Sequence, residues 1–361
     1  MTPRPQPGIM NIAAYVGGKS NVAGRKNILK LSSNEGALGP SPKVQARLRG
    51  IGDWHRYPDG SATDVRDALA ARYDLPMDQI VCGAGSDELI TLLIQAYAGV
   101  DDEVIHSEHG FSMYAISAQA HGAIPVAAPE KNLCADVDAL LSAVTERTKL
   151  VFIANPNNPT GSYLPKSEID RLHAGLPNHV ILVIDGAYSE YVVEADYDDC
   201  LHSALASTNM VVTRTFSKLY ALGGLRLGWM VGPAAIVDVI NRIRGPFNVS
   251  AAAIAAGAEA VADTDFENQS RQLNSQQMAR MVGSIGQLGL KTHPSVGNFL
   301  LIDFDDQNRA VAADAFLQST GIILRQVSGY GLPTCLRLTL GTEAQMTRVL
   351  DALAAYLETE K

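Results

Sequence analysis

The 361-residue chain lacks the cysteine and histidine patterns that disulfide-linked and metal-binding proteins require. Its four cysteines are far apart and none forms a CxxC pair, so we expect buried free thiols in a reducing compartment. The eight histidines show neither HxH nor HExxH spacing. His106 and His109 are three residues apart, but no third ligand is evident near them. The sequence therefore predicts no metal site.

The charge and hydropathy of the chain argue against a nucleic-acid-binding, membrane or secreted protein. The net charge is −9 and there is no long basic run, which argues against a nucleic-acid partner, because phosphate-backbone binding needs clustered Lys and Arg. The longest apolar run, residues 250–257, is too short to span a bilayer. Near the start, prolines stand where a signal peptide would carry its apolar core. We expect a cytoplasmic protein that does not enter a membrane.

Strand and helix patterns alternate through the middle of the chain. Strands are expected at 80–82, 103–106, 124–127, 150–154, 180–185 and 210–213, with helices at 112–121, 136–145, 166–174 and near 201–206. This alternation predicts an α/β fold with a largely parallel sheet. Ligands of such sheets bind beyond the carboxyl ends of the strands.

The pattern also predicts three parts of the chain. Residues 1–40 are rich in proline and glycine and resemble an arm that lies on another surface, which favours a partner subunit. Residues 41–265 hold the alternating pattern and form the expected large domain. Residues 266–361 show a long helix followed by helix, strand, strand and helix patterns, which indicate a smaller α+β domain.

Four polar motifs follow the expected strands and should meet at one edge of the sheet. They are GAGS at 83–86, NPNNPTG at 155–161, DGAY at 185–188 and TFSK at 215–218. The first is a strand, a glycine turn and then a helix, a geometry that aims backbone N–H groups at an anion. Each motif alone is weak, but four at one edge predict a functional site.

The stretch 211–230 carries the most chemistry. Lys218 lies beside Ser217 near a turn, where desolvation or a neighbouring cation would make its amine nucleophilic. Thr215, Ser217 and Arg226 offer the hydroxyl groups and the guanidinium fork that suit a phosphate. Together with Asp185 and an asparagine and a tyrosine at the same edge, this set fits pyridoxal phosphate.

The motifs also carry a resemblance that covers essentially the whole chain. NPNNPTG, VIDGAY and TRTFSKLYALGGLRLGW resemble those of the fold-type I aminotransferases. RYPDG at 56–60, GAGSDE at 83–88, CLRLTLGT at 335–342 and AYVGGKS at 14–20 narrow the resemblance to the histidinol-phosphate aminotransferase family. That likeness implies a large domain with a mostly parallel seven-stranded sheet and a smaller α+β domain.

The resemblance implies roles around pyridoxal 5′-phosphate. Lys218 would form the internal aldimine and carry the proton, Asp185 would pair with the pyridine nitrogen, and Asn158 and Tyr188 would bind the ring hydroxyl. Phe111 would lie against the ring. The phosphate would be bound by Ala84, Gly85, Ser86, Thr215, Ser217 and Arg226, with Tyr57 reaching in from the other subunit of a homodimer.

The resemblance also implies the substrates. Amino-group transfer would run from L-histidinol phosphate to 2-oxoglutarate, giving imidazole acetol phosphate and glutamate in histidine biosynthesis. Arg337 would bind the substrate carboxylate and Arg325 the distal anion, with Tyr15 and Asn34 from the arm completing the pocket.

Two departures from the family pattern leave alternatives open. This chain has Gly186 where the family usually has glutamate, and Gly36-Ala37 where it usually has Asn-Pro. Both changes are expected near the substrate entrance. An aromatic amino acid aminotransferase therefore remains an alternative, as does a decarboxylase similar to the threonine-phosphate enzyme of the same fold.

Overall fold

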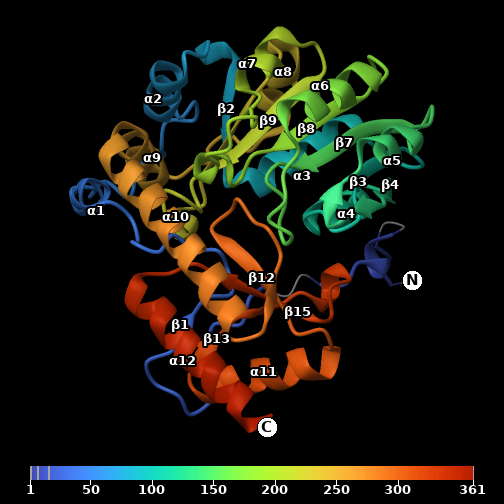
Figure 1. The fold of residues 1–361 in the computed structure, drawn as a ribbon. Coiled ribbons are helices and arrows are strands. Elements are labelled where there is room, and N and C mark those ends of the chain that lie inside the picture. Colours follow the sequence, from blue (N-terminus) through green and yellow to red (C-terminus); the bar gives the residue numbers. More distant parts are fainter. Residues whose placement is uncertain (1, 6–7, 15–16, 361) are drawn as a thin grey trace.

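A seven-stranded sheet and a four-stranded sheet lie in separate halves of the molecule, and the long helix α10 (Thr264–Gln287) runs from one half into the other (Figure 1). The structure is a computed structural model that describes residues 2–5, 8–14 and 17–360. No helix within these residues is both long enough and apolar enough to cross a membrane.

The seven-stranded sheet has the strand order β2-β10-β9-β8-β7-β3-β4. Only β10 is antiparallel to its neighbours, so the predicted α/β fold with a mostly parallel sheet is confirmed. In chain order the strands are β2 (Ile80–Gly83), β3 (Glu103–Ser107), β4 (Ile124–Ala128), β7 (Thr148–Ala154), β8 (Ile181–Asp185), β9 (Met210–Thr215) and β10 (Gly228–Val231).

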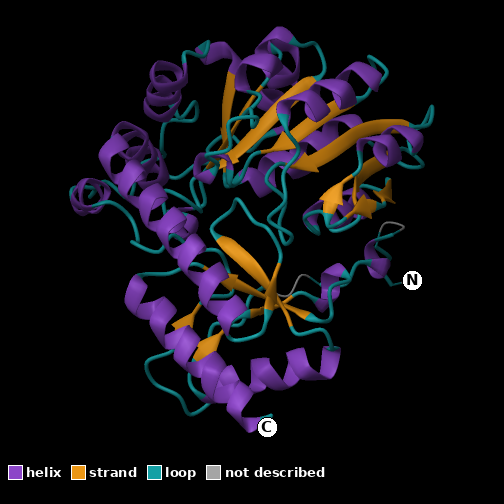
Figure 2. Ribbon diagram, viewed as in Figure 1, coloured by secondary structure: helices purple, strands orange, loops and turns teal. Residues whose placement is uncertain are grey.

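Helices cover both faces of this sheet (Figure 2). Alternate residues of the central strands enter different hydrophobic clusters: Leu182 and Ile184 face one side, while Ile181 and Val183 face the other. Such strands are apolar on both faces because neither face meets water. The helices are α1 (Pro42–Arg49), α2 (Thr63–Tyr73), α3 (Ser86–Tyr97), α4 (Met113–Ala120), α5 (Val137–Ser142), α6 (Lys166–Gly175), α7 (Leu201–Ala206), α8 (Ala234–Ile243) and α9 (Ala251–Ala262).

The four-stranded sheet is antiparallel and has the order β11-β12-β15-β14. Its strands are β11 (Lys291–Thr292), β12 (Phe299–Asp303), β14 (Arg325–Gln326) and β15 (Cys335–Thr339), packed against α11 (Gln307–Ser319) and α12 (Glu343–Thr359). On β15, Leu336 and Leu338 enter the core beneath these helices. Cys335, Arg337 and Thr339 therefore lie on the opposite face of the sheet.

Two small pairings complete the structure. Strand β1 (Leu29–Lys30) of the arm pairs in parallel with β13 (Ile322–Ile323), so the arm is attached to the half that holds the four-stranded sheet. A short hairpin of β5 (Glu130–Lys131) and β6 (Cys134–Ala135) projects from the other half. Just beyond β1, the Ser32 carbonyl oxygen accepts a hydrogen bond from Arg337, so the arm reaches the face of the four-stranded sheet that carries Arg337.

Strand β10 passes so close to the turn before α3 that only glycine fits at its first residue. A β-carbon on Gly228 would overlap the backbone nitrogen of Ser86 and lie 2.5 Å from the carbonyl carbon of Gly85. Both neighbours are backbone atoms, which cannot turn away as a side chain can. This contact fixes the start of α3 against the edge of β10.

We expect Gly228→Ala to lower the free energy of unfolding by about 1–3 kcal/mol, because the added carbon must displace the β2–α3 turn. Gly224→Ala is the matched control, since a β-carbon there meets no atom within 4 Å, and it should change stability by less than about 0.5 kcal/mol. Denaturant unfolding of both variants makes the comparison. Equal losses would show that the close approach at Gly228 is not the cause.

Candidate active site

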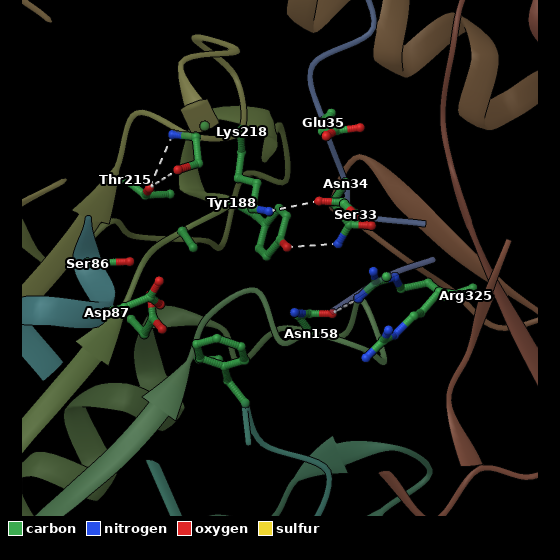
Figure 3. Close-up of a pocket in the computed structure, with 18 of the residues that line it drawn as sticks. Ser33, Asn34, Glu35, Ser86, Asp87, Asn158, Tyr188, Thr215, Lys218 and Arg325 are labelled. Atoms are coloured by element: carbon green, nitrogen blue, oxygen red, sulfur yellow. Dashed lines mark hydrogen bonds between the residues drawn. The ribbon is translucent and has the colours of Figure 1, made fainter. Parts of the chain in front are cut away.

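A cavity of about 360 Å³ lies between the two halves, at the carboxyl ends of β7, β8 and β9. The arm, both sheets and the start of α3 contribute to its wall (Figure 3). Its lining includes Asn34, Ser86, Phe111, Asn158, Asp185, Tyr188, Thr215, Ser217, Lys218, Arg226, Arg325 and Arg337. The motifs found separately in the sequence therefore share one cavity.

Lys218 follows β9 and projects into this cavity. Its Nζ donates a hydrogen bond to the Ser33 carbonyl oxygen at 3.1 Å and lies 5.7 Å from the centre of the Tyr188 ring. Burial, assisted by the nearby Arg337 cation, lowers the pKa of Lys218 from 10.5 to about 8. A useful fraction of the amine is therefore neutral near physiological pH and can act as a nucleophile or base.

Asp185 ends β8 and is buried. Its Oδ2 accepts a 2.7 Å hydrogen bond from the Tyr114 hydroxyl. Its Oδ1 is buried and accepts no hydrogen bond of ordinary geometry from a described residue, although Thr213 and the Ala187 N–H are near enough to lower the pKa. Burial outweighs these contacts and raises the pKa of Asp185 to about 6. At neutral pH this is a carboxylate with one oxygen available to a cationic N–H donor.

Tyr188 is connected to both the arm and the four-stranded sheet through Asn34. The Asn34 side-chain amide donates to the Tyr188 hydroxyl at 2.8 Å, and the Asn34 Oδ1 accepts from the Thr339 hydroxyl at 3.1 Å. Burial raises the pKa of Tyr188 to about 12, so the phenol keeps its proton. Because the hydroxyl oxygen accepts from Asn34, its proton is left for a ligand in the cavity.

Two arginines on neighbouring strands face the cavity. Arg325 on β14 is directly opposite Arg337 on β15. The Arg337 guanidinium donates to the Asn158 side-chain oxygen and, at 2.8 Å, to the Ser32 carbonyl oxygen, and it lies 5.3 Å from the centre of the Phe299 ring. Like charges opposite one another across strands are unfavourable. The pair is therefore suited to an anion.

A second anion cradle forms around the first turn of α3. Gly85 precedes this helix with a φ of +93°, and a β-carbon there would lie 2.5 Å from the Arg226 guanidinium. Arg226 is exposed and pairs with Asp87 at 3.0 Å. The Thr215 and Ser217 hydroxyls are 3.0 Å apart and border the same space. A helix N-terminus, hydroxyls and a guanidinium together suit a phosphate.

Some of the predicted residues lie elsewhere. Ala84 and Gly85 are not part of the cavity wall, although Gly85 adjoins the cradle beside Arg226. The Ala84 N–H donates to Glu88 at 2.6 Å and the Gly85 N–H donates to the Gly83 carbonyl at 2.8 Å, so neither N–H is left for an anion. Tyr57 is 82% exposed, stacks on Phe247 with ring centres 4.6 Å apart, and is not part of this chain's cavity wall. Tyr15 lies outside the described residues.

The two departures from the family pattern are in different places. Gly186 does not line the cavity, and a β-carbon on it would lie 2.5 Å from the Ser189 hydroxyl and 3.0 Å from Arg214. Gly36 packs against the lysine loop, since a β-carbon there would lie 2.8 Å from the Lys218 carbonyl oxygen. Thus Gly186 lies outside the cavity wall, whereas Gly36 permits close approach of the arm to Lys218.

Sequence reasoning missed three residues that shape the site. Tyr114 holds Asp185, Thr339 holds Asn34, and Tyr330 lines the cavity with its hydroxyl 3.3 Å from that of Ser112. Tyr114 lies in the helix expected at 112–121, and the apolar spacing of that helix could have indicated that Tyr114 is buried. Tyr114 and Tyr330 belong to no local motif, and Thr339 lies in CLRLTLGT at 335–342 without any local sign of its contact with the arm. Each of the three contacts a residue distant in the chain.

Comparison with known proteins agrees with this geometry. The family model for aminotransferase class I and II matches residues 26–353. The histidinol-phosphate aminotransferase of Rhodospirillum centenum is 53% identical over 358 residues, covering 99% of each chain, and that of Paramagnetospirillum magneticum is 54% identical, covering 98% of this chain and 99% of its own. The crystal structure of the Sinorhizobium meliloti histidinol-phosphate aminotransferase in complex with pyridoxal-5′-phosphate superposes with a TM-score of 0.92 at 28% identity, covering 100% of this chain and 99% of that one. The chain therefore belongs to the class I and II aminotransferases, a family of pyridoxal-phosphate-dependent enzymes.

Proposed function

We propose that the protein transfers the amino group between L-histidinol phosphate and 2-oxoglutarate in histidine biosynthesis. The proposal rests on one cavity that holds Lys218, whose pKa is lowered, together with Arg325 and Arg337 at paired positions of neighbouring strands. The Rhodospirillum centenum and Paramagnetospirillum magneticum relatives both bear the name histidinol-phosphate aminotransferase, which supports this choice of substrate.

The residues present fit pyridoxal phosphate. The buried Asp185 Oδ1 suits a protonated ring nitrogen, and the phosphate suits the cradle of Ser86, Thr215, Ser217 and Arg226. Asn158, Tyr188 and Phe111 line the same cavity. In the proposed arrangement, Asn158 and Tyr188 would bind the ring hydroxyl and Phe111 would lie against the ring. When bound, the cofactor supplies an aldehyde that combines with amines and a cationic ring that draws electrons from the substrate Cα.

Lys218 is the proposed covalent attachment point and the proposed proton carrier. Its amine, whose pKa is lowered, would take the proton from the substrate Cα and carry it to the carbon at which the proton is added back. Ser33 and the Tyr188 ring border the amine and limit its orientations. Asp185 would support this transfer, because its negative charge would stabilise a proton on the ring nitrogen of the bound cofactor.

The two arginines are the proposed anion site for both substrates. Histidinol phosphate presents a phosphate, and glutamate presents a second carboxylate, so one cationic pair can serve both reactants in turn. Arg337 is held by Asn158 and Ser32, which fixes its guanidinium, while Arg325 is on the short edge strand β14. Asn34 completes the wall beside Tyr188.

Donor preference tests the assignment. We expect histidinol phosphate to change the cofactor absorbance of the holoenzyme fastest in single turnovers, ahead of phenylalanine and tyrosine. Arg325→Gln should lower kcat/KM for histidinol phosphate roughly 10- to 100-fold, the worth of a charged hydrogen bond, and affect phenylalanine much less. Equal rates with phenylalanine would move the assignment to an aromatic aminotransferase. Carbon dioxide release would move it to a decarboxylase.

The lowered pKa of Lys218 predicts how covalent capture of the cofactor depends on pH. Only the neutral amine reacts, so the rate at which cofactor-free protein captures pyridoxal phosphate should rise about tenfold per pH unit below 8 and level off above it. Borohydride trapping and mass spectrometry of the Lys218 peptide measure the rate. Arg337→Gln removes a neighbouring cation and should move the midpoint upward. A wild-type midpoint near 10 would refute the lowered pKa.

The proposed assembly is a homodimer in which Tyr57 binds the partner's phosphate. Tyr57 and Phe247 form an exposed stacked pair, and Trp54 nearby in the sequence is 67% exposed. Exposed aromatic groups of this kind are enriched in interfaces. The cavity of one chain receives no contact from its own Tyr57, which is consistent with a role in another subunit.

Mixed dimers test this arrangement. Lys218→Ala and Tyr57→Ala subunits are each expected to have low activity alone. Refolded together, they should regain up to half of the activity per mixed dimer, because one site then combines an intact Lys218 with an intact Tyr57 from the other chain. Light scattering checks the dimer. Recovery should fail if Tyr57 acts within its own chain, and a fully active monomer would exclude the proposed assembly.

A further inference from the structure

Three metal-binding side chain types meet on one face of the four-stranded sheet, away from Lys218. They are His293, Asp303 and Cys335, and they form the one such group found within the described residues. None of them lines the cavity between the halves. They come from β12, β15 and the residue just after β11, which are neighbouring strands.

The strand register explains why these side chains meet. Asp303 and Cys335 are direct partners across β12 and β15. On the other side, β11 pairs Thr292 with Ile302, and the His293 N–H continues the ladder by donating to the Leu301 carbonyl oxygen at 3.1 Å. His293 is therefore diagonal to Asp303. Residues at these positions share one face of the sheet.

The ligand atoms are already close to the separations that a zinc ion requires. His293 Nε2 is 3.5 Å from Asp303 Oδ2 and 3.9 Å from Cys335 Sγ, and all three ligand atoms lie within 4.8 Å of one another. Tetrahedral zinc with bonds of about 2.0 Å to nitrogen and oxygen and about 2.3 Å to sulfur places such atoms roughly 3.3–3.6 Å apart. Small side-chain rotations would therefore complete the site.

The surroundings hold the ligands and leave a route for an ion. The Asp303 Oδ1 accepts a 2.9 Å hydrogen bond from the Asp305 N–H, which leaves Oδ2 directed to His293. The His293 and Asp303 side chains are 33% and 20% exposed, while Cys335 is buried beneath them. A metal can thus enter from the solvent side, with water as a fourth ligand.

We propose that His293, Asp303 and Cys335 bind one zinc ion, as a site separate from the amino-transfer chemistry. The thiolate, imidazole and carboxylate donors favour zinc over magnesium or calcium, which prefer oxygen ligands. On binding, the Cys335 thiol exchanges its proton for a sulfur–zinc bond, and the proton passes to solvent. The ion joins three strands and stabilises the sheet that carries Arg337, two residues beyond Cys335.

Zinc titration of chelator-treated holoenzyme by calorimetry tests the proposal. We expect one zinc per chain and a rise in Tm with zinc, since a ligand that binds the folded state stabilises it. Cys335→Ala and His293→Gln should each weaken the binding at least tenfold and remove the rise in Tm. Cys134→Ala is the matched control, because its partly buried thiol contacts the Tyr163 carbonyl and not this group.

The two variants keep the test decisive. His293 is partly exposed, so His293→Gln serves if Cys335→Ala does not fold. Stoichiometric binding that depends on both residues, with Cys134→Ala unchanged, supports the site. Binding below one zinc per four chains, or binding that survives in both variants, overturns it and leaves His293 and Asp303 as neighbouring side chains beside a buried thiol.

Discussion

Three consecutive arm residues hold the reactive groups of both halves in one place. The Ser32 carbonyl accepts from Arg337, the Ser33 carbonyl accepts from Lys218, and the Asn34 amide donates to Tyr188. Each of these groups is at least partly buried, so a missing partner would cost about 1–3 kcal/mol. The arm itself is anchored by β1 pairing with β13 and by Asn298 and Thr339 contacts to Asn34. The geometry of the cavity therefore depends on where the arm lies.

Burial acts in opposite directions on the two central ionisable groups. It raises the pKa of Asp185 to about 6 and lowers that of Lys218 to about 8, because each charged form loses hydration. A cationic ring nitrogen beside Asp185 would restore the carboxylate's preference for ionisation. The same burial, together with the Arg337 cation, keeps part of the lysine amine neutral and available as a base. A single buried cavity can thus hold a neutral Lys218 amine, which accepts protons, and an ionised Asp185 carboxylate at the same pH.

One sheet face connects the proposed anion site with the proposed zinc site. Cys335, Arg337 and Thr339 alternate along β15 and face away from the helices of their own half. Thr339 holds the arm, Arg337 faces the cavity, and Cys335 meets His293 and Asp303. The leucines between them bury the other face. A five-residue strand thereby presents three different polar functions at intervals set only by the pleat.

The sequence by itself determined the parts of this protein that depend on local pattern. Alternating strands and helices predicted the α/β sheet. Because ligands of such sheets bind beyond the carboxyl ends of the strands, the sequence also predicted that Ser86, Asn158, Asp185 and Lys218 share one cavity. The reversed direction of β10 was not predicted, because apolar periodicity does not encode strand direction. Helix α8 was not predicted either, although its buried residues Ile236, Val237 and Ile240 recur at helical spacing. Tyr114 beneath Asp185, the arm carbonyls and the meeting of His293 with Cys335 were decided by the tertiary structure alone. Such contacts join residues tens to hundreds of positions apart, and only packing and strand register bring them together.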